Sequence, residues 1–253
     1  MGHRIKIPRL LGEAVHGNGI AGRLLRPAVN ALVPARPTII TVLSGVAAGA
    51  RMIIEPKSEK FYWTGAHEPA VQDQLLSSLK LGDVFWDLGA HIGFFTLIAS
   101  RLVGPNGHVH AFEPHTENRG RLEQSLALNG TTNVSIHSEA FGSKPGPGRL
   151  RRSDSSLMWS LMSEKDTGDG ELVECTTLDV MTERLGCPDM IKVDVEGAEW
   201  SVLQGGDSLL ARNTVLIVVE FLSAASLDRA FEQWPAYQFA QLDDKNWVMS
   251  PKA

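Results

Sequence analysis

Short apolar runs alternate with longer amphipathic segments from Asp83 onward. β-branched and aromatic runs of this length are typical of strands, whereas apolar residues three and four positions apart are typical of helices. The pattern predicts strands over 83–89, 107–114 and 133–140, separated by helices over 94–103 and 117–130. Such alternation indicates βαβ units and a parallel sheet with right-handed crossovers.

The alternation continues toward the C-terminus. Segments 189–197 and 213–221 are predicted as buried strands with a helix over 198–206 between them, and 236–243 and 245–250 as an antiparallel final pair. Two further strands, 148–152 and 171–178, flank a polar stretch, Ser153–Gly170, that is typical of a surface loop or lid. We therefore expect an α/β fold with a doubly wound, mostly parallel sheet.

The first 64 residues follow a different pattern. Prolines break the first forty positions into short pieces, and β-branched runs at 38–43 and 50–56 around a Gly/Ala turn predict a hairpin. A helix is expected from about Pro69, with Val71, Leu75, Leu76 and Leu79 at helical spacing. We expect an N-terminal helical and hairpin extension over 1–64, whose arm packs on the domain or on a second subunit as a homodimer, and a ligand-binding domain over 65–253.

Composition limits the classes of partner and the cellular compartment that we expect. The 253 residues carry a net charge of −5, so no global basic field attracts nucleic acid. The longest apolar run, Ile39–Ala50, is shorter than the roughly 20 residues that a membrane-spanning helix needs. Cys175 and Cys187 lack metal-site spacing, and we expect two buried free thiols. A cytoplasmic protein is the expectation.

The turn after the first strand of the domain is the main candidate for ligand binding. Its sequence, Asp87-Leu-Gly89-Ala90-His91-Ile-Gly93, is D-x-G-x-x-x-G. In α/β sheets such a turn brings backbone N–H groups and a helix N-terminus to a ligand at the strand ends. A nicotinamide dinucleotide site has a further glycine for the pyrophosphate, at a place that Ala90 and His91 occupy here.

Two acids favour a nucleoside that carries an amino acid over a dinucleotide. Glu113 ends the second strand about 20 residues after Gly93, where such folds place an acid on the ribose hydroxyls. Asp87 suits an ammonium group and would repel a phosphate. Alternatively, Asp87 caps the turn and Glu113 is a solvated strand end.

Three blocks, 87–97, 111–130 and 191–206, together resemble the FkbM-type family of S-adenosylmethionine-dependent methyltransferases. The resemblance implies a class I, Rossmann-like methyltransferase fold. It places Asp87, Gly89 and Gly93 around the methionine part of the cofactor and Glu113 on the ribose, with Ser138, Glu139 and Ala140 near the adenine. Ala90, His91 and Pro114 are further expected cofactor-binding residues. The family's usual asparagine between the glycines is His91 here.

Three further acids end strands at the same edge of the sheet: Asp194, Glu196 and Glu220. We expect them to be catalytic, with Asp194 also near the cofactor. Asp194 or Glu196 can act as base, and Glu196 can instead brace its glycine turn. Asp194 and Glu220 can also share Mg²⁺, which prefers oxygen ligands, although a metal-free site is the preferred hypothesis.

The segment before the domain offers aromatic and titratable side chains. The residues that can line the pocket are Tyr62, Trp63, His67 and Glu68, although the aromatic residues can instead pack against the hairpin. By location, the candidate bases are His67 and His115. In the polar loop, the candidate gate contacts are Met158 and Trp159. The family resemblance implies an O-methyltransferase acting on a hydroxyl of a sugar, glycolipid or polyketide-like metabolite in secondary metabolism. The alternatives are an NAD-dependent oxidoreductase and a non-catalytic S-adenosylmethionine-binding protein.

Overall fold

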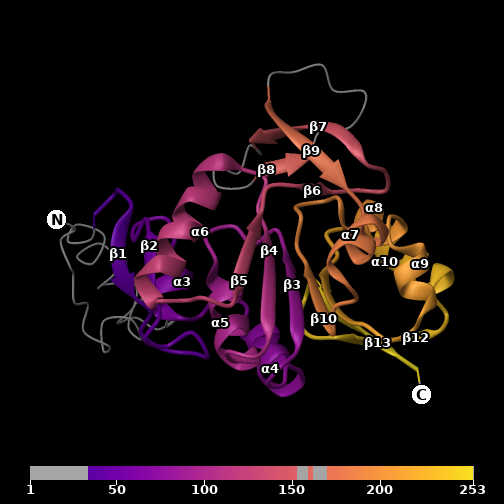
Figure 1. The fold of residues 1–253 in the computed structure, drawn as a ribbon, viewed down its shortest axis with the longest axis horizontal. Helices are drawn as coiled ribbons and strands as arrows, with labels where there is room; N and C mark the ends of the chain where they lie inside the picture. Colours follow the sequence, from indigo (N-terminus) through magenta and orange to yellow (C-terminus); the bar gives the residue numbers. More distant parts are fainter. Residues whose placement is uncertain (1–33, 153–158, 162–169, 253) are drawn as a thin grey trace.

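The computed structural model describes residues 34–152, 159–161 and 170–252 (Figure 1). Its central element is a seven-stranded sheet. In spatial order the strands are β12 (Tyr237–Gln241), β13 (Asn246–Pro251), β11 (Leu216–Glu220), β10 (Met190–Val193), β3 (Val84–Leu88), β4 (His108–Phe112) and β5 (Val134–His137). The strands from β11 to β5 pair parallel, and β13 pairs antiparallel with β11 and β12. The predicted α/β fold and its antiparallel tail are confirmed.

Helices cover both faces of this sheet, since successive strand residues point to opposite sides. Phe85 of β3 packs with α4 (Pro69–Ser78), α5 (Phe94–Val103) and α6 (Thr116–Asn129). Trp86, the next residue, packs on the other side. The helices there are α7 (Leu178–Leu185), α8 (Glu199–Gln204), α9 (Asp207–Ala211) and α10 (Ala224–Gln233). The sheet is therefore doubly wound.

Some helices differ from the expectation. The aromatic segment before the domain includes a short helix, α3 (Lys60–Thr64). Helix α4 begins at Pro69 as predicted, and Val71 and Leu75 are buried, but Leu76 is 53% exposed because it lies on the solvent side. Helices α7, α9 and α10 were not predicted.

The N-terminal hairpin consists of β1 (Thr38–Thr41) and β2 (Arg51–Ile54), paired antiparallel as expected. It packs against α6, where Ser125 Oγ accepts a hydrogen bond of 3.1 Å from the Ile53 N–H. Arg121 of α6 also contacts Glu59, which follows β2. The hairpin thus fixes the segment that leads into α3. The arm of the expected extension, residues 1–33, and the dimer predicted through it lie outside the described residues.

A smaller sheet is inserted between β5 and α7. Its strands, in spatial order, are β6 (Ala140–Phe141), β9 (Glu171–Thr176), β7 (Gly146–Arg152) and β8 (Trp159–Leu161). Figure 1 shows it beyond one end of the central sheet. The predicted strands at 148–152 and 171–178 are confirmed. Of the predicted Ser153–Gly170 loop, only the backbone of β8 and Gly170 are described, so Met158 and the side chain of Trp159 lie outside the description.

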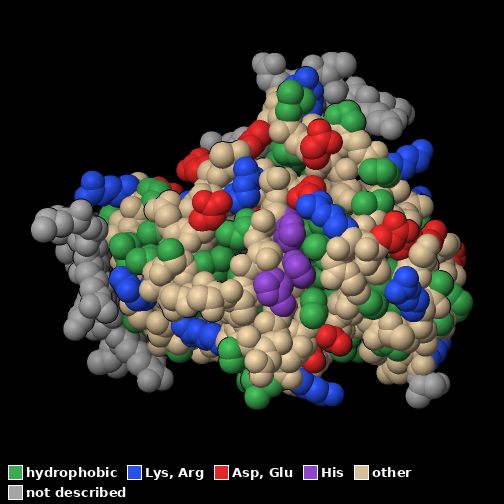
Figure 2. All heavy atoms as spheres, viewed as in Figure 1, with side chains coloured by type: hydrophobic (Ala, Val, Ile, Leu, Met, Phe, Trp, Pro, Cys, Tyr) green, Lys and Arg blue, Asp and Glu red, His purple; other side chains and the backbone are tan. Residues whose placement is uncertain are grey.

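The surface of the described part mixes charges of both signs. On the face shown in Figure 2, acidic and basic side chains are interspersed, and histidine side chains gather in a row. Within the described ranges, no helix has the length and apolar character needed to span a membrane. Cys175 and Cys187 are free thiols, but Cys187 is exposed and Cys175 half-buried, so the expectation of two buried thiols is wrong. Cys187 is exposed because it lies in the loop between α7 and β10.

Candidate functional site

A cavity of about 400 Å³ lies at the carboxyl ends of the parallel strands. Four strand ends contribute to it: Gly89 follows β3, Glu113 follows β4, Asp194 follows β10 and Glu220 ends β11. Ligands of open α/β sheets bind at this edge. The structure therefore brings together residues that the sequence placed at separate strand ends.

The glycines of the turn make room for other parts of the protein. Gly89 has a φ of +79°, and a Cβ there would lie 1.8 Å from the carbonyl oxygen of Asp194. Gly93 has a φ of +90°, and its Cβ would lie 2.4 Å from Leu122 Cδ1. Gly89 lines the cavity, whereas Gly93 lies behind it at the N-cap of α5. Glycine at these positions lets the strand-to-helix turn press against β10 and α6.

His91 lies in the same turn with a φ of 50°, in the left-handed region. Its backbone N–H donates to Glu113 Oε2 at 2.8 Å, and its Nδ1 lies 3.0 Å from the Tyr62 hydroxyl oxygen. Burial lowers the pKa of His91 to about 4, so the ring is neutral at pH 7. His91 therefore joins the turn to α3 and to β4.

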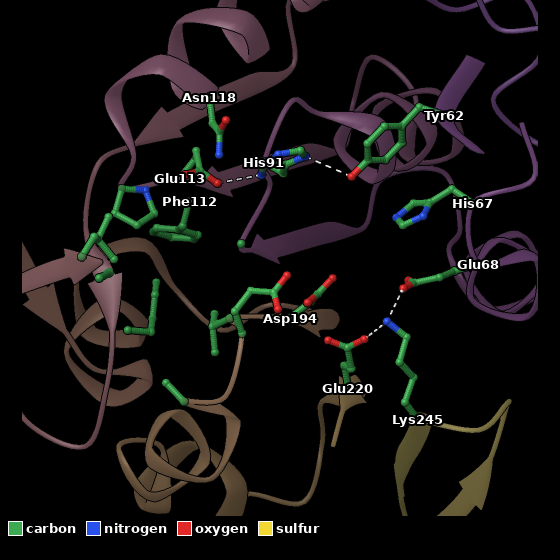
Figure 3. A pocket seen from close by; sticks show the side chains of 18 of the residues that line it. Tyr62, His67, Glu68, His91, Phe112, Glu113, Asn118, Asp194, Glu220 and Lys245 are labelled. Atoms are coloured by element: carbon green, nitrogen blue, oxygen red, sulfur yellow. Dashed lines mark hydrogen bonds and ion pairs between the residues drawn. The ribbon is translucent and has the colours of Figure 1, made fainter. Parts of the chain in front are cut away.

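Glu113 faces the cavity from the end of β4. Its Oε2 accepts from His91, and its Oε1 accepts from the His115 N–H at 2.9 Å. Burial raises the pKa of Glu113 to about 7. Each carboxylate oxygen has a second lone pair, so Glu113 can still accept from a ligand hydroxyl. Pro114 also lines the cavity, and Figure 3 shows Asn118 beside Glu113.

Asp87 lies beneath the cavity and is not among the residues that line it. Thr96 of α5 donates to its Oδ2 at 2.6 Å, while its Oδ1 is buried and has no hydrogen-bond partner within the described ranges. Burial raises the pKa of Asp87. Ala90 also lies in the turn next to the cavity floor.

Lys192, a residue that the sequence analysis did not single out, lies among the buried acids. It is 2% exposed, and its Nζ lies 2.8 Å from Asp194 Oδ2. Burial acts to raise the pKa of Asp194, but the charge and hydrogen bond of Lys192, together with Glu220 and His67, lower it to about 2. Asp194 is therefore ionised at neutral pH.

Glu196 and Glu220 differ from Asp194 in their proton affinity. Burial and the charge of Asp194 raise the pKa of Glu196 to about 7 and that of Glu220 to about 8. Glu196 has a φ of 57°, and the following Gly197 N–H donates to Glu199 at 2.8 Å. Glu199 therefore braces the loop after β10, a role that the sequence analysis considered for Glu196.

Lys245 was also missed by the sequence analysis. It lies in the turn between β12 and β13, where Asp243 Oδ1 accepts from its backbone N–H at 3.1 Å. Its ammonium contacts Glu220 and lies 3.3 Å from Glu68 Oε1. Figure 3 shows Lys245 between these two carboxylates at one side of the cavity. Only tertiary structure brings this turn to the cavity, so no local sequence signal indicates the contact.

The other candidate residues divide into cavity and packing positions. Tyr62, His67 and Glu68 line the cavity, and burial lowers the pKa of His67 to about 3. The indole of Trp63 is buried and donates to the Pro56 carbonyl at 3.0 Å, so Trp63 packs against the extension. His115 does not line the cavity, and its side chain caps α6.

The expected adenine end is formed by the small sheet and β4. Glu139 and Ala140 line the cavity, whereas Ser138 does not, and the place of these residues near the adenine stays a prediction. Phe112, Phe141 and Leu150 add an apolar wall that the sequence analysis did not identify.

A metal site at the strand ends finds little support in the donor set. No group of three or more His, Cys, Asp or Glu residues within 34–152, 159–161 and 170–252 is arranged to hold a metal ion. Asp194 and Glu220 each have a lysine ammonium as counter-ion. Mg²⁺ at these two residues stays an untested alternative to the metal-free site.

Comparisons with known proteins place the chain in a methyltransferase family. The family model described as "Methyltransferase FkbM domain" matches residues 87–244. The chain is similar to the hexuronic acid methyltransferase AglP of Haloferax volcanii, with 31% identity over 150 residues, 57% of this chain and 58% of AglP. The chain thus spans little more than half the length of that relative.

Among solved structures, the chain resembles the methyltransferase FkbM from Methylobacillus flagellatus KT. The TM-score is 0.50 at 18% identity, and the match covers 66% of this chain and 43% of that one. This likeness concerns the fold, and it supports the class I, Rossmann-like architecture expected from the sequence.

Proposed function

The chain belongs to the FkbM methyltransferase family, and from this premise we propose that it is an S-adenosylmethionine-dependent methyltransferase acting on a hydroxyl of a small-molecule acceptor. The observation that carries the proposal is the cavity at the ends of β3, β4, β10 and β11, beside the glycine turn. S-adenosylmethionine would supply a methyl group on a sulfonium.

The residues present fit that cofactor. Glu113 offers acceptor lone pairs for ribose hydroxyls, and Phe112, Phe141 and Leu150 offer an apolar wall for the adenine. Asp194 lines the cavity and offers a carboxylate to a cationic ligand, whereas Asp87 lies beneath the cavity and, like Asp194, has Lys192 as a neighbouring cation. Ala90 and His91 stand where a dinucleotide turn has the further glycine that admits the pyrophosphate, which counts against a dinucleotide.

We assign the methyl acceptor to the part of the cavity lined by Glu68, Asp194, Glu196, Glu220 and Lys245, which we call the acceptor end. The acids there differ in their suitability as the base that removes the acceptor's proton. A general base is most effective when its pKa lies near the working pH, and it contributes roughly 10²–10⁴-fold. Glu196 and Glu220, with pKa values raised to about 7 and about 8, meet that condition. Asp194, held ionised by Lys192, is a weak base and suits orientation of the acceptor or cofactor.

A sugar acceptor is supported by the name of the relative AglP, a hexuronic acid methyltransferase. A glycolipid or a polyketide-like metabolite of secondary metabolism remains within the same proposal.

The test is release of S-adenosylhomocysteine across a panel of hydroxylated sugars and metabolites, with and without EDTA. We expect turnover with at least one hydroxylated acceptor, insensitive to EDTA. Cofactor binding without turnover on any acceptor would favour the non-catalytic alternative. NAD⁺-dependent oxidation of an alcohol would favour the oxidoreductase.

A further inference from the structure

We propose that the acceptor end of the cavity selects an uncharged or cationic acceptor rich in hydrogen-bond donors, such as a polyol or an amino sugar, and that Glu68 binds it. A carboxylate-bearing acceptor is disfavoured. This inference rests on the proposed function, because it assigns the remaining part of the same cavity to the acceptor.

Glu68 has an unsatisfied acceptor at the cavity. Its side chain is 10% exposed and points toward the cavity from the start of α4 (Figure 3). Its Oε1 lies 3.3 Å from Lys245 Nζ, but its Oε2 is buried with no hydrogen-bond partner in the described part of the chain. Because buried polar atoms are nearly always hydrogen-bonded, a ligand donor is the natural partner of this oxygen.

The backbone at Glu68 supports a role outside the helix. Glu68 is the N-cap residue of α4, yet its side chain makes no capping hydrogen bond. Its φ of 42° is uncommon for a residue with a side chain, and such strain concentrates at functional sites. The conformation directs the carboxylate to the cavity and away from the N–H groups of the helix.

The surrounding side chains supply acceptors and few donors. Besides Glu68, the carboxyl groups of Asp194, Glu196 and Glu220 line this end of the cavity. Among the described residues, Lys245 is the sole lysine or arginine lining it, and its ammonium already contacts Glu68 and Glu220. Lys192 is paired with Asp194 beneath the surface.

The chemistry of the acceptor follows from this inventory. The ionised carboxylate of Asp194 only accepts hydrogen bonds, and Glu68 Oε2 is an acceptor without a partner in the described part of the chain, so a complementary ligand supplies O–H or N–H groups. A ligand carboxylate would add acceptors and a negative charge beside the acids, and a like charge at short range in a partly buried site is unfavourable. The expected acceptor class therefore differs from the hexuronic acid in the name of AglP.

The test uses probes that do not require the natural acceptor to be known. They are nitrogen analogues of S-adenosylmethionine in which the methyl group is replaced by a 2-aminoethyl, 2-hydroxyethyl or carboxymethyl arm. We expect calorimetry with the full chain at pH 7 to rank affinity as aminoethyl, hydroxyethyl, carboxymethyl, with at least about tenfold between the extremes. Equal or tighter binding of the carboxymethyl analogue overturns the inference.

A matched pair of variants assigns the effect to Glu68. Glu68→Gln removes the charge with little change of shape, and we expect it to reduce the preference for the aminoethyl over the carboxymethyl arm severalfold. Asp73→Asn makes the same charge change at an exposed position of α4, and we expect it to leave the preference unchanged. An unchanged preference in Glu68→Gln removes Glu68 from the proposal. Loss of binding of S-adenosylhomocysteine to the unmodified chain would instead contradict the proposed function.

Discussion

Glu113 is the residue whose geometry most directly connects the turn to a ligand. Its two oxygens hold the backbone N–H groups of His91 and His115 while its side chain faces the cavity. One residue therefore shapes the turn and has lone pairs left for a ligand in the cavity, where we propose that the cofactor's ribose binds.

The variant Glu113→Gln is expected to weaken S-adenosylmethionine binding. At pH 8, where Glu113 with its pKa of about 7 is ionised, the variant loses one acceptor and the charge. A hydrogen bond to a charged group contributes about 1.5–3 kcal/mol, or roughly 10–100-fold in affinity. Calorimetry measures the loss, with circular dichroism as a check of folding. Glu117→Gln, at an exposed position of α6, is the control and keeps wild-type affinity. Equal affinities of the two variants would remove Glu113 from the cofactor site.

Lys192 is expected to be required for stability. The variant Lys192→Met leaves Asp194 and the buried Asp87 without their ammonium counter-ion. Breaking a buried ion pair by removing one partner costs about 3–5 kcal/mol. Urea unfolding at pH 7 measures the cost, and the double variant Lys192→Met/Asp194→Asn is expected to recover much of it. A double variant as unstable as the sum of the singles would show that the pair is not coupled.

Some of these residue roles were predictable from the sequence and others were not. Glu113 was found because strand ends and glycine spacing are local patterns. A lysine in a buried run, two positions before Asp194 and so on the same side of the chain, was a readable signal for Lys192. Lys245 had no such signal, because its partners come from α4 and β11.

At the scale of elements, the turn between β3 and α5 depends on close backbone approach. Gly89 and Gly82 both have positive φ, but only at Gly89 would a Cβ meet backbone, since nothing lies within 4 Å at Gly82. Comparing alanine variants of the two glycines therefore separates the destabilisation caused by backbone conformation from that caused by a steric clash.

Gly82→Ala is expected to cost about 1–2 kcal/mol, the cost of a left-handed backbone for alanine. Gly89→Ala is expected to cost several kcal/mol more and to abolish cofactor binding, because β10 and the turn must separate. Thermal unfolding and calorimetry measure both effects. Similar costs for the two variants would contradict the packing of Gly89 against Asp194.

The elements themselves were largely predictable. Helix α5 spans the predicted residues because nearly all of its own residues are apolar or buried. Strands β10 and β11 were predicted because each is a short run of buried apolar residues. Helices α7 and α10 were missed because they are short and rich in polar residues. Both have local N-cap signals, since Thr177 and Ser223 accept from backbone N–H groups three residues later.

For the whole molecule, the buried glutamates couple stability to pH. Burial raises the pKa of Glu113 to about 7, of Glu196 to about 7 and of Glu220 to about 8. The pKa of glutamate in an unfolded chain is about 4.3. The folded state therefore binds these protons more tightly. The stabilisation that these three glutamates contribute is fully present below about pH 4.3, and it is lost as the pH rises through their pKa values in the folded state.

Buried histidines act in the opposite direction at lower pH. Burial lowers the pKa of His67 to about 3 and of His91 to about 4, so the unfolded state binds more protons between these values and about pH 6.5. Above that pH the histidines add no further change. We expect the free energy of unfolding to fall between about pH 6.5 and 8.5, by roughly 1–3 kcal/mol. Urea unfolding at a series of pH values across this range measures the change. A free energy of unfolding that stays constant or rises with pH would contradict the account.

The most direct measurement of the central claim is calorimetric titration of the folded chain with S-adenosylmethionine and, separately, with NAD⁺. We predict saturable binding of one S-adenosylmethionine per chain and no saturable binding of NAD⁺. A folded chain that binds NAD⁺ in preference, or that binds neither, would contradict the assignment of this cavity to S-adenosylmethionine.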